Sequence, residues 1–163
     1  MQKPIAIAVC VLLLNGPLLA QDKPAGDSNQ KPKPAATPEQ LEATFKAMLT
    51  KATLNGHWCS TKDGKLGPEK EDKYNIVGAN KVGGDKWVIS TRIKMNGRET
   101  VVPIPAEVKW AGDTAVLSVD NLQYPGAGTY SARVLFHEHT YAGTWSGGDQ
   151  GGLLYGIITN EKE

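Results

Sequence analysis

The chain contains very little cysteine: Cys10 and Cys59 are its only two. Cys10 lies in an N-terminal apolar segment that we expect to be removed, so we expect no intrachain disulfide and a fold held together by packing. Cys59 lies two residues after His57, a spacing that would place both on one face of a strand. No third group is identifiable to orient such a nucleophile and base. We therefore expect Cys59 to be a buried or half-buried thiol, the commoner state of free cysteine.

An excess of charge of either sign is also missing. The sequence has 18 Lys and Arg against 17 Asp and Glu, and removal of Lys3 with the N-terminal segment leaves 17 of each and a net charge of zero. Such a chain has no global electrostatic reason to bind nucleic acid or an anionic membrane. Its 163 residues, 40% hydrophobic and 21% charged, are typical of one globular domain with one core.

Motifs of catalytic or cofactor chemistry are absent from the sequence as well. It has no Ser, His and Asp arrangement and no nucleotide fingerprint, and its glycine pairs at 147–148 and 151–152 lack the following helix that phosphate binding requires. Six acidic residues, four among lysines and two that bracket a strand, are interpreted as solvent-facing turn residues: Asp63, Glu69, Glu71, Asp72, Asp113 and Asp120. We therefore expect no cofactor and do not predict an enzyme.

Long hydrophobic runs are missing too. The apolar run near the N-terminus covers residues 5–14, and the residues NGP interrupt it well short of the ~20 residues that a membrane-spanning helix needs. With the positive Lys3 before it and the small Ala20 after it, the run predicts a secretory signal peptide over residues 1–20. We expect a secreted or periplasmic protein that begins at Gln21, with no stable membrane span after cleavage.

Two segments connect this leader to the rest of the chain. Residues 21–36 have no aromatic or β-branched residue and several prolines, which predicts a disordered, semi-extended linker. Residues 37–52 predict a helix, because Thr37 can cap it, Pro38 fits its first position and Gln40 completes a capping box.

The predicted helix has one apolar stripe, at spacings i, i+4, i+7 and i+8: Leu41, Phe45, Met48 and Leu49. We expect the helix to end near Lys51 and to pack on the domain that follows. The alternative is a partner-binding or membrane-surface helix, but the polar face is acidic rather than basic.

From residue 53 to 163 the hydrophobic period changes from helical to alternating. The alternation is clearest over residues 86–95, where one face holds Trp87, Ile89, Thr91, Ile93 and Met95. The eight predicted strands are residues 54–60, 74–81, 86–95, 99–110, 114–119, 130–137, 141–146 and 153–159. The glycine-rich and Asn-Gly turn signals between them predict an antiparallel meander, either closed into a barrel or flattened into a sandwich.

Two of these strands have unusual composition. Pro103 and Pro105 cannot donate to a ladder, so we expect a break, a bulge or a sheet edge there. Residues 141–159 alternate large residues with glycines around a glycine-rich turn, which is interpreted as the closing hairpin of a small barrel. We expect one face of this hairpin to hold Trp145, Leu153, Tyr155 and Ile157.

Two short segments resemble a known family. The residues NGHW at 55–58, at the start of the first strand after a short helix, resemble the G-x-W signature of the calycins, the eight-stranded barrels that include lipocalins and avidins. The residues TWSG at 144–147 are similar to the tryptophan strand of avidin-type barrels. The resemblance implies an all-β fold, an up-and-down antiparallel meander closed into a calycin-like barrel of about eight strands, and a tendency to bind small hydrophobic ligands. No second or third lipocalin motif is recognisable.

The leading functional hypothesis is an exported, non-enzymatic binding module that holds a small apolar ligand inside the barrel. Its candidate ligand-binding residues are Trp58, Trp87, Ile89, Phe136, Trp145 and Tyr155. The alternative is a structural or protein-interaction domain whose interior is filled by Trp87, Ile89, Ile93, Val134, Phe136 and Tyr155. We also expect Trp58 and Trp145 to be structural residues, buried against the helix or the closed end of the barrel. The sequence identifies no protein partner.

Histidine provides the only candidate metal ligands, His57, His137 and His139. The pair at 137 and 139 would project to one face of a continuous strand, a spacing that suits zinc or copper. The competing interpretation is that the residues HEHT form a polar turn between two strands, and we favour it because hairpin loops of this length are common. A metal-dependent enzyme is therefore the third functional class.

Overall fold

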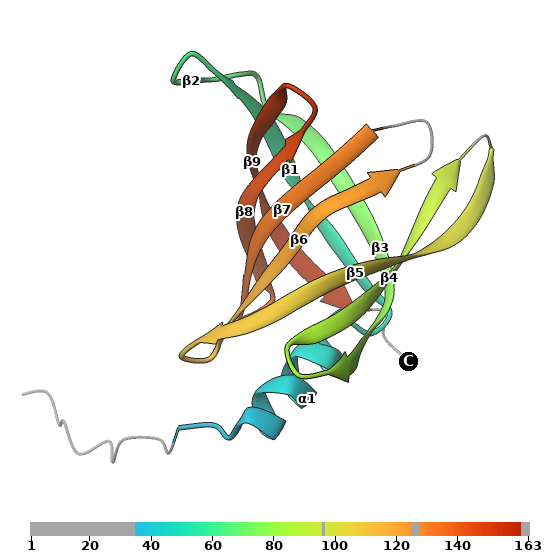
Figure 1. Ribbon diagram of the computed structural model, residues 1–163, viewed down its shortest axis with the longest axis vertical. Helices are drawn as coiled ribbons and strands as arrows, with labels where there is room; N and C mark the ends of the chain where they lie inside the picture. The colour runs from blue at the N-terminus through green and yellow to red at the C-terminus, as the bar shows by residue number, and fades with distance from the viewer. Residues whose placement is uncertain (1–34, 96, 125–127, 161–163) are drawn as a thin grey trace, which may run out of the picture. The chain divides into compact units, whose positions relative to one another are not determined.

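The structure is a computed structural model that describes residues 35–95, 97–124 and 128–160 (Figure 1). These residues belong to one compact unit, Ala35–Glu163. The expected signal peptide, almost all of the expected linker and Asn96 of the expected Asn-Gly turn lie outside the described residues. None of the helices among the described residues is both long enough and apolar enough to cross a membrane.

The single helix of the described part, α1, covers Pro38–Leu49. It begins with the predicted capping box: the Gln40 backbone N–H donates to the Thr37 hydroxyl at 3.3 Å, and the Thr37 N–H donates to the Gln40 side chain at 2.9 Å. The helix ends two residues before the predicted Lys51, which has a left-handed φ of 48° and redirects the chain into the first strand.

Nine strands follow the helix: β1 Ala52–Lys62, β2 Lys65–Leu66, β3 Lys70–Gly83, β4 Lys86–Met95, β5 Arg98–Ala111, β6 Thr114–Tyr124, β7 Gly128–His137, β8 Thr140–Gly147 and β9 Gln150–Asn160. Strand β1 pairs antiparallel with both β3 and β9, and from β3 to β9 each strand pairs antiparallel with the next, so eight strands close an up-and-down barrel while β2 extends β1 at its end. The predicted all-β fold and all eight predicted strands are confirmed. The closure excludes the sandwich, and the two-residue β2 was not predicted.

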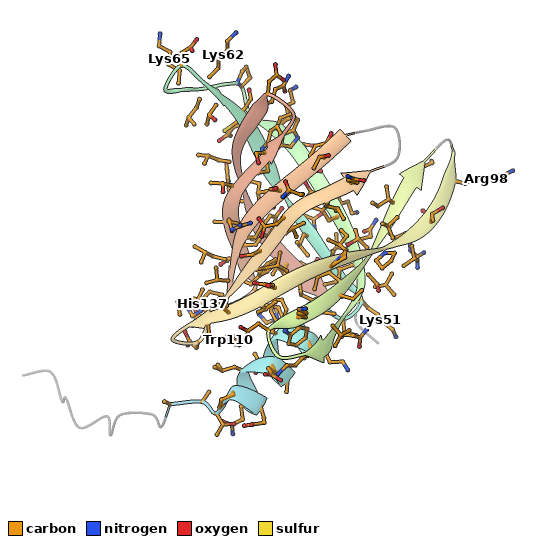
Figure 2. All side chains as sticks on the ribbon, in the orientation of Figure 1. Lys51, Lys62, Lys65, Arg98, Trp110 and His137 are labelled. Carbon is orange, nitrogen blue, oxygen red and sulfur yellow. The ribbon has the colours of Figure 1, made fainter. Side chains whose placement is uncertain are left out.

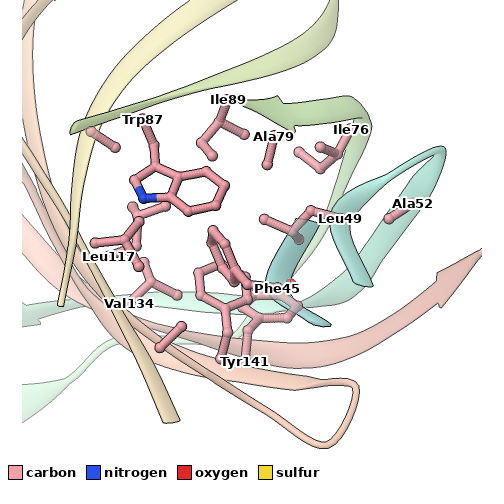
Figure 3. Close-up of a cluster of buried hydrophobic side chains, with 14 of the residues drawn as sticks. Phe45, Leu49, Ala52, Ile76, Ala79, Trp87, Ile89, Leu117, Val134 and Tyr141 are labelled. Atoms are coloured by element: carbon pink, nitrogen blue, oxygen red, sulfur yellow. The ribbon is translucent and has the colours of Figure 1, made fainter. Parts of the chain in front are cut away.

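One end of the barrel is filled by the apolar side of α1 (Figure 3). Phe45 and Leu49 are each only 1% exposed. The Phe45 ring meets the rings of Trp87 at 5.3 Å and Phe136 at 5.6 Å, both edge-on, the arrangement that aromatic quadrupoles prefer. The expected packing of the helix on the barrel is therefore present. At this end the interior is occupied by the side chains of the hydrophobic core.

The prolines lie on an edge, one of the three outcomes expected for them. Strand β5 is continuous through Pro103 and Pro105 and pairs with β4 over residues 98–107, but it pairs with β6 only over residues 107–111. Among the described residues the first part of β5 therefore has a ladder partner on one side only, and Figure 1 shows the β4–β5 hairpin diverging from β6. An unpaired edge tolerates proline, because alternate residues direct their N–H groups to that edge.

In the closing hairpin, most of the side chains expected on the inner face lie on the outer face. The turn between β8 and β9 places Gly147 opposite Gln150, so Trp145 pairs with Gly152, and Leu153 lies on the other face. Leu153, Tyr155 and Ile157 are outside and 37%, 42% and 55% exposed. The prediction that these three share a face with Trp145 is wrong, because the segment LLYGII is apolar on both faces and its composition does not determine which face is inside.

Inward aromatic side chains lie over glycines of the neighbouring strands. Gly56 pairs with Gly156, which pairs with Tyr141, so the three form one row across β1, β9 and β8. A side chain on Gly156 would come within 2.7 Å of the Tyr141 ring, and one on Gly147 within 2.5 Å of the Tyr130 ring. The glycines of this wall therefore provide the space that its aromatic rings occupy.

A candidate ligand cup at the open end of the barrel

Trp58 and Trp145 lie at the end of the barrel opposite α1. Asn160, the last residue of β9, donates to carbonyls in the last turn of α1, whereas Gly152 opposite Trp145 lies near the other end of that strand. Figure 2 shows the same two ends, with His137 and Trp110 towards α1 and Lys62 away from it. The expectation that these tryptophans are buried at the closed end is therefore wrong. The tryptophans that contact the helix are Trp87 and Trp110.

The two tryptophan rings form one wall of a cavity of about 500 Å³. Their centroids are 5.4 Å apart at an interplanar angle of 84°. The cavity, which we call the cup, is lined by Trp58, Asp72, Tyr74, Tyr130, Trp145, Gly147, Asp149, Gln150 and Leu154. Four aromatic rings and one leucine supply its apolar surface. A small number of polar groups beside a mainly apolar surface is the usual composition of a small-molecule site.

Asp72 and Tyr74 are polar residues that line the cup, and Tyr141 is buried in the barrel interior outside that lining. The Tyr74 hydroxyl donates to the Asp72 carboxylate. Tyr141 is 3% exposed, and its hydroxyl has no hydrogen-bond partner among the described residues. Burial, and then the negative charge of Asp72, raise the pKa of Tyr141 to about 12. Burial and the bond to Asp72 also raise the pKa of Tyr74. Both hydroxyls therefore stay protonated at neutral pH.

Asp72 was expected to be a solvent-facing turn residue, and this prediction is wrong. Strand β3 begins at Lys70, four residues earlier than predicted, and Asp72 lies within it, partly buried on the same face as Tyr74 and Ile76. Alternation could not identify the start of this strand, because the inward and outward positions of the sequence KEDK are equally polar.

Two further polar groups belong to the tryptophans of the cup wall or lie against them. The Lys70 ammonium lies 4.7 Å from the centroid of the Trp58 ring, a cation–π contact at the rim. The Trp145 indole N–H is buried and has no acceptor among the described residues. A buried donor without an acceptor costs about 1–3 kcal/mol, so the cup wall contains unused hydrogen-bonding capacity.

The other ligand-binding candidates lie elsewhere. Trp87, Ile89 and Phe136 are 3%, 6% and 5% exposed in the core at the α1 end and do not line the cup. Tyr155, expected in the interior, lies on the outer face, so that placement is wrong. Its hydroxyl donates to Glu69 at 2.7 Å, which raises its pKa, and its ring stacks on His57 at 5.9 Å.

The three histidines are not brought together. Residues 138 and 139 are a two-residue hairpin turn with φ of 45° and 61°, between β7 and β8, so the interpretation of HEHT as a turn is confirmed. His137 lies 3.6 Å from Asp113, while His57 is three strands away on the outer face of β1. Within the described ranges no group of three or more His, Cys, Asp or Glu side chains could hold a metal ion. Cys59, 3% exposed, is the expected buried thiol.

Sequence reasoning placed two residues of the cup, Trp58 and Trp145, and missed the rest. Tyr130 and Leu154 fell within predicted strands, but neither was assigned to the interior. The inward position of Tyr130 follows from alternation, because Tyr130 is an even number of residues from the buried Val134 and Phe136. The inward position of Leu154 does not follow in this way, because its neighbour in β9 is equally apolar.

The comparisons with known proteins find no relative. No protein-family model, no curated protein and no solved structure matches the chain. The closed eight-stranded barrel agrees with the architecture that the resemblance to calycins implies, and membership of a family does not follow from it.

Proposed function

We propose that the protein is an exported binding module that holds one small molecule in the cup. The observation that carries the proposal is the division of the barrel interior: the α1 end is filled by core side chains, and the other end opens into an aromatic-lined cavity of about 500 Å³. Pockets for small ligands are typically ~300–1,000 Å³ and mainly apolar. An eight-stranded barrel is just wide enough for one such ligand.

Two sequence features support export and a lipocalin-like role. The pattern of residues 1–20 is that of a secretory signal peptide, and the segment NGHW resembles the calycin signature. The proposed ligand differs from the purely apolar one that the resemblance implies, because Asp72 and Tyr74 put polar groups in the cup.

The packing of α1 favours a second candidate, a structural or protein-interaction domain with a filled core. Phe45 and Leu49 are fully buried, so this half of the barrel has the side-chain packing that such a domain requires. The two candidates differ in what they predict for the cup, which a scaffold would leave empty in solution.

A fluorescence titration separates them. N-phenyl-1-naphthylamine, a neutral apolar dye, should bind with one site per chain and gain fluorescence. Trp58→Phe should weaken this binding about fivefold, because it removes aromatic wall contact that contributes ~1 kcal/mol. Trp110→Phe, at the α1 end, is the matched control and should leave the affinity unchanged. Absence of saturable dye binding, or equal effects of the two variants, would contradict the proposed function.

A further inference from the structure

The lining of the cup combines aromatic rings with negative charge. Strands β1, β3, β7 and β8 each contribute one ring to it: Trp58, Tyr74, Tyr130 and Trp145. Among the described residues that line the cup, the charged side chains are two carboxylates, Asp72 in β3 and Asp149 in the turn between β8 and β9. Tyr74 and Tyr130 are 36% and 39% exposed, so their surfaces are accessible to a ligand.

The faces of these rings attract cations, because the quadrupole of an aromatic ring is negative on its faces. The structure contains one cation on such a face. Lys70 pairs with Trp58 across the β1–β3 ladder, and its ammonium lies 4.7 Å from the centroid of that ring. Lys70 is exposed and does not belong to the lining of the cup. The rings of the cup and its two carboxylates therefore favour a cationic ligand, while an anion would be repelled.

A quaternary ammonium fits this lining better than a primary one. A primary ammonium has three N–H donors and loses hydrogen bonds to water where it meets ring faces. The two oxygens of Asp72 already accept hydrogen bonds, one from the Lys73 N–H at 2.9 Å and the other from the Tyr74 hydroxyl. A quaternary ammonium has no donor to satisfy, and it needs only ring faces for its methyl groups and negative charge nearby.

From this lining we infer that the cup binds a small ligand with a quaternary ammonium group, with its methyl groups on the aromatic rings and its charge balanced by Asp72 and Asp149. The inference rests on the proposed function and assigns the class of ligand to the same cup. The cavity of about 500 Å³ is larger than such a group, so the ligand has room for an uncharged remainder.

The test is a titration of the purified protein with choline, followed by the NMR shifts of its tryptophan indole groups at constant ionic strength. The control ligand is neohexyl alcohol, which has the shape of choline with a carbon atom in place of the charged nitrogen. Choline should bind about tenfold more tightly than this alcohol, because only choline is attracted by the ring faces and the carboxylates. Ethanolamine, which carries a primary ammonium, should bind about fivefold more weakly than choline.

Three variants test the charges. Asp149→Asn should weaken choline binding about threefold and leave the affinity of the neutral dye unchanged. Asp113→Asn is the matched control and should have no effect, because Asp113 occupies the same position in a Gly-Asp turn at the α1 end of the barrel. Lys70→Gln should strengthen choline binding about threefold, because it removes a like charge from the Trp58 ring.

The outcomes separate the two proposals. If the dye binds and depends on Trp58, but choline binds no more tightly than neohexyl alcohol, the inference is wrong and the proposed function stands. The inference is also wrong if Asp149→Asn and Asp113→Asn bind choline equally tightly. If neither the dye nor choline binds, both proposals fail.

Discussion

Gly156→Ala tests whether the glycines of the barrel wall exist to make room for aromatic rings. A side chain at this position would overlap the Asn55 carbonyl oxygen and would come within 2.7 Å of both the Gly56 Cα and the Tyr141 ring. Two of these three atoms belong to the backbone of β1, which is held in the ladder that closes the barrel, so they cannot move away independently. The substitution must shift the strand or the ring.

The expected magnitude follows from two opposing effects. Overpacking a well-packed interior costs ~1–3 kcal/mol, while a Gly to Ala change stabilises by ~0.4–1 kcal/mol through the lower entropy of the unfolded chain. We expect a net loss of about 1.3 kcal/mol in the free energy of unfolding. With a urea m-value of about 1.5 kcal/mol/M, the midpoint should fall by roughly 0.9 M at unchanged m.

Gly78→Ala is the matched control. Gly78 also lies in a strand of the barrel, and an added side chain there meets no atom within 4 Å. This variant carries only the entropic gain and should have the parent midpoint or a slightly higher one. Equal midpoints for Gly156→Ala and Gly78→Ala would refute the argument that ring packing explains the glycines.

Four further predictions use other parts of the molecule. The pKa of Tyr141 is raised from 10 to about 12, so the folded state binds the phenolic proton more tightly than the unfolded chain does. The contribution of this group to the free energy of unfolding should be fully present below pH 10 and should be lost as pH rises through 12. Urea titrations at each pH should show that Tyr141→Phe lessens this loss by about 2 kcal/mol. His139→Gly should raise the free energy of unfolding by about 0.5–1 kcal/mol, because it relieves a left-handed φ of 61°, and an unchanged urea midpoint would count against strain there. Addition of zinc, copper or a chelator should leave the melting temperature unchanged, since the three histidines lie apart; a rise that His137→Ala and His57→Ala both abolish would show a metal site. Terminal sequencing of the native protein should find Gln21 first, and an intact Met1 on cytosolic protein would contradict export.

The elements of the fold could be predicted because their signals are local. The Thr37 and Gln40 capping box sets the start of α1, and the alternation over residues 86–95 sets β4 to the residue. Closure into a barrel was predicted only through the resemblance, because alternation alone fits a sandwich equally well. The pairing of β1 with β9 decides the matter, and it joins segments about 100 residues apart in the chain.

The site could not be predicted to the same extent, because it depends on which face of each strand is inside. Where one face is polar the answer follows from composition, as at Trp87 and Ile89. In β9 the sequence LLYGII is apolar on both faces, and the two-residue turn before it determines that Leu154 lies inside and Tyr155 outside. In β3 both faces of KEDK are charged, which hid Asp72. Leu154 and Asp72 were therefore missed because their neighbours in the strand have the same polarity.

The same polarity argument explains why a site can exist at this end of the barrel and not at the other. At the α1 end, Phe45 enters the barrel and meets Trp87, Trp110 and Phe136, so stability there increases with every apolar contact, and a polar group would lose its hydrogen bonds to water. At the other end no helix enters among the described residues, and the aromatic rings of the wall line an open cavity that also holds Asp72 and Tyr74. Polar groups can remain there because the cavity is open to water, which the filled end excludes. A ligand that occupies the cup should therefore add to stability, and binding of the dye should raise the melting temperature of the parent more than that of Trp58→Phe.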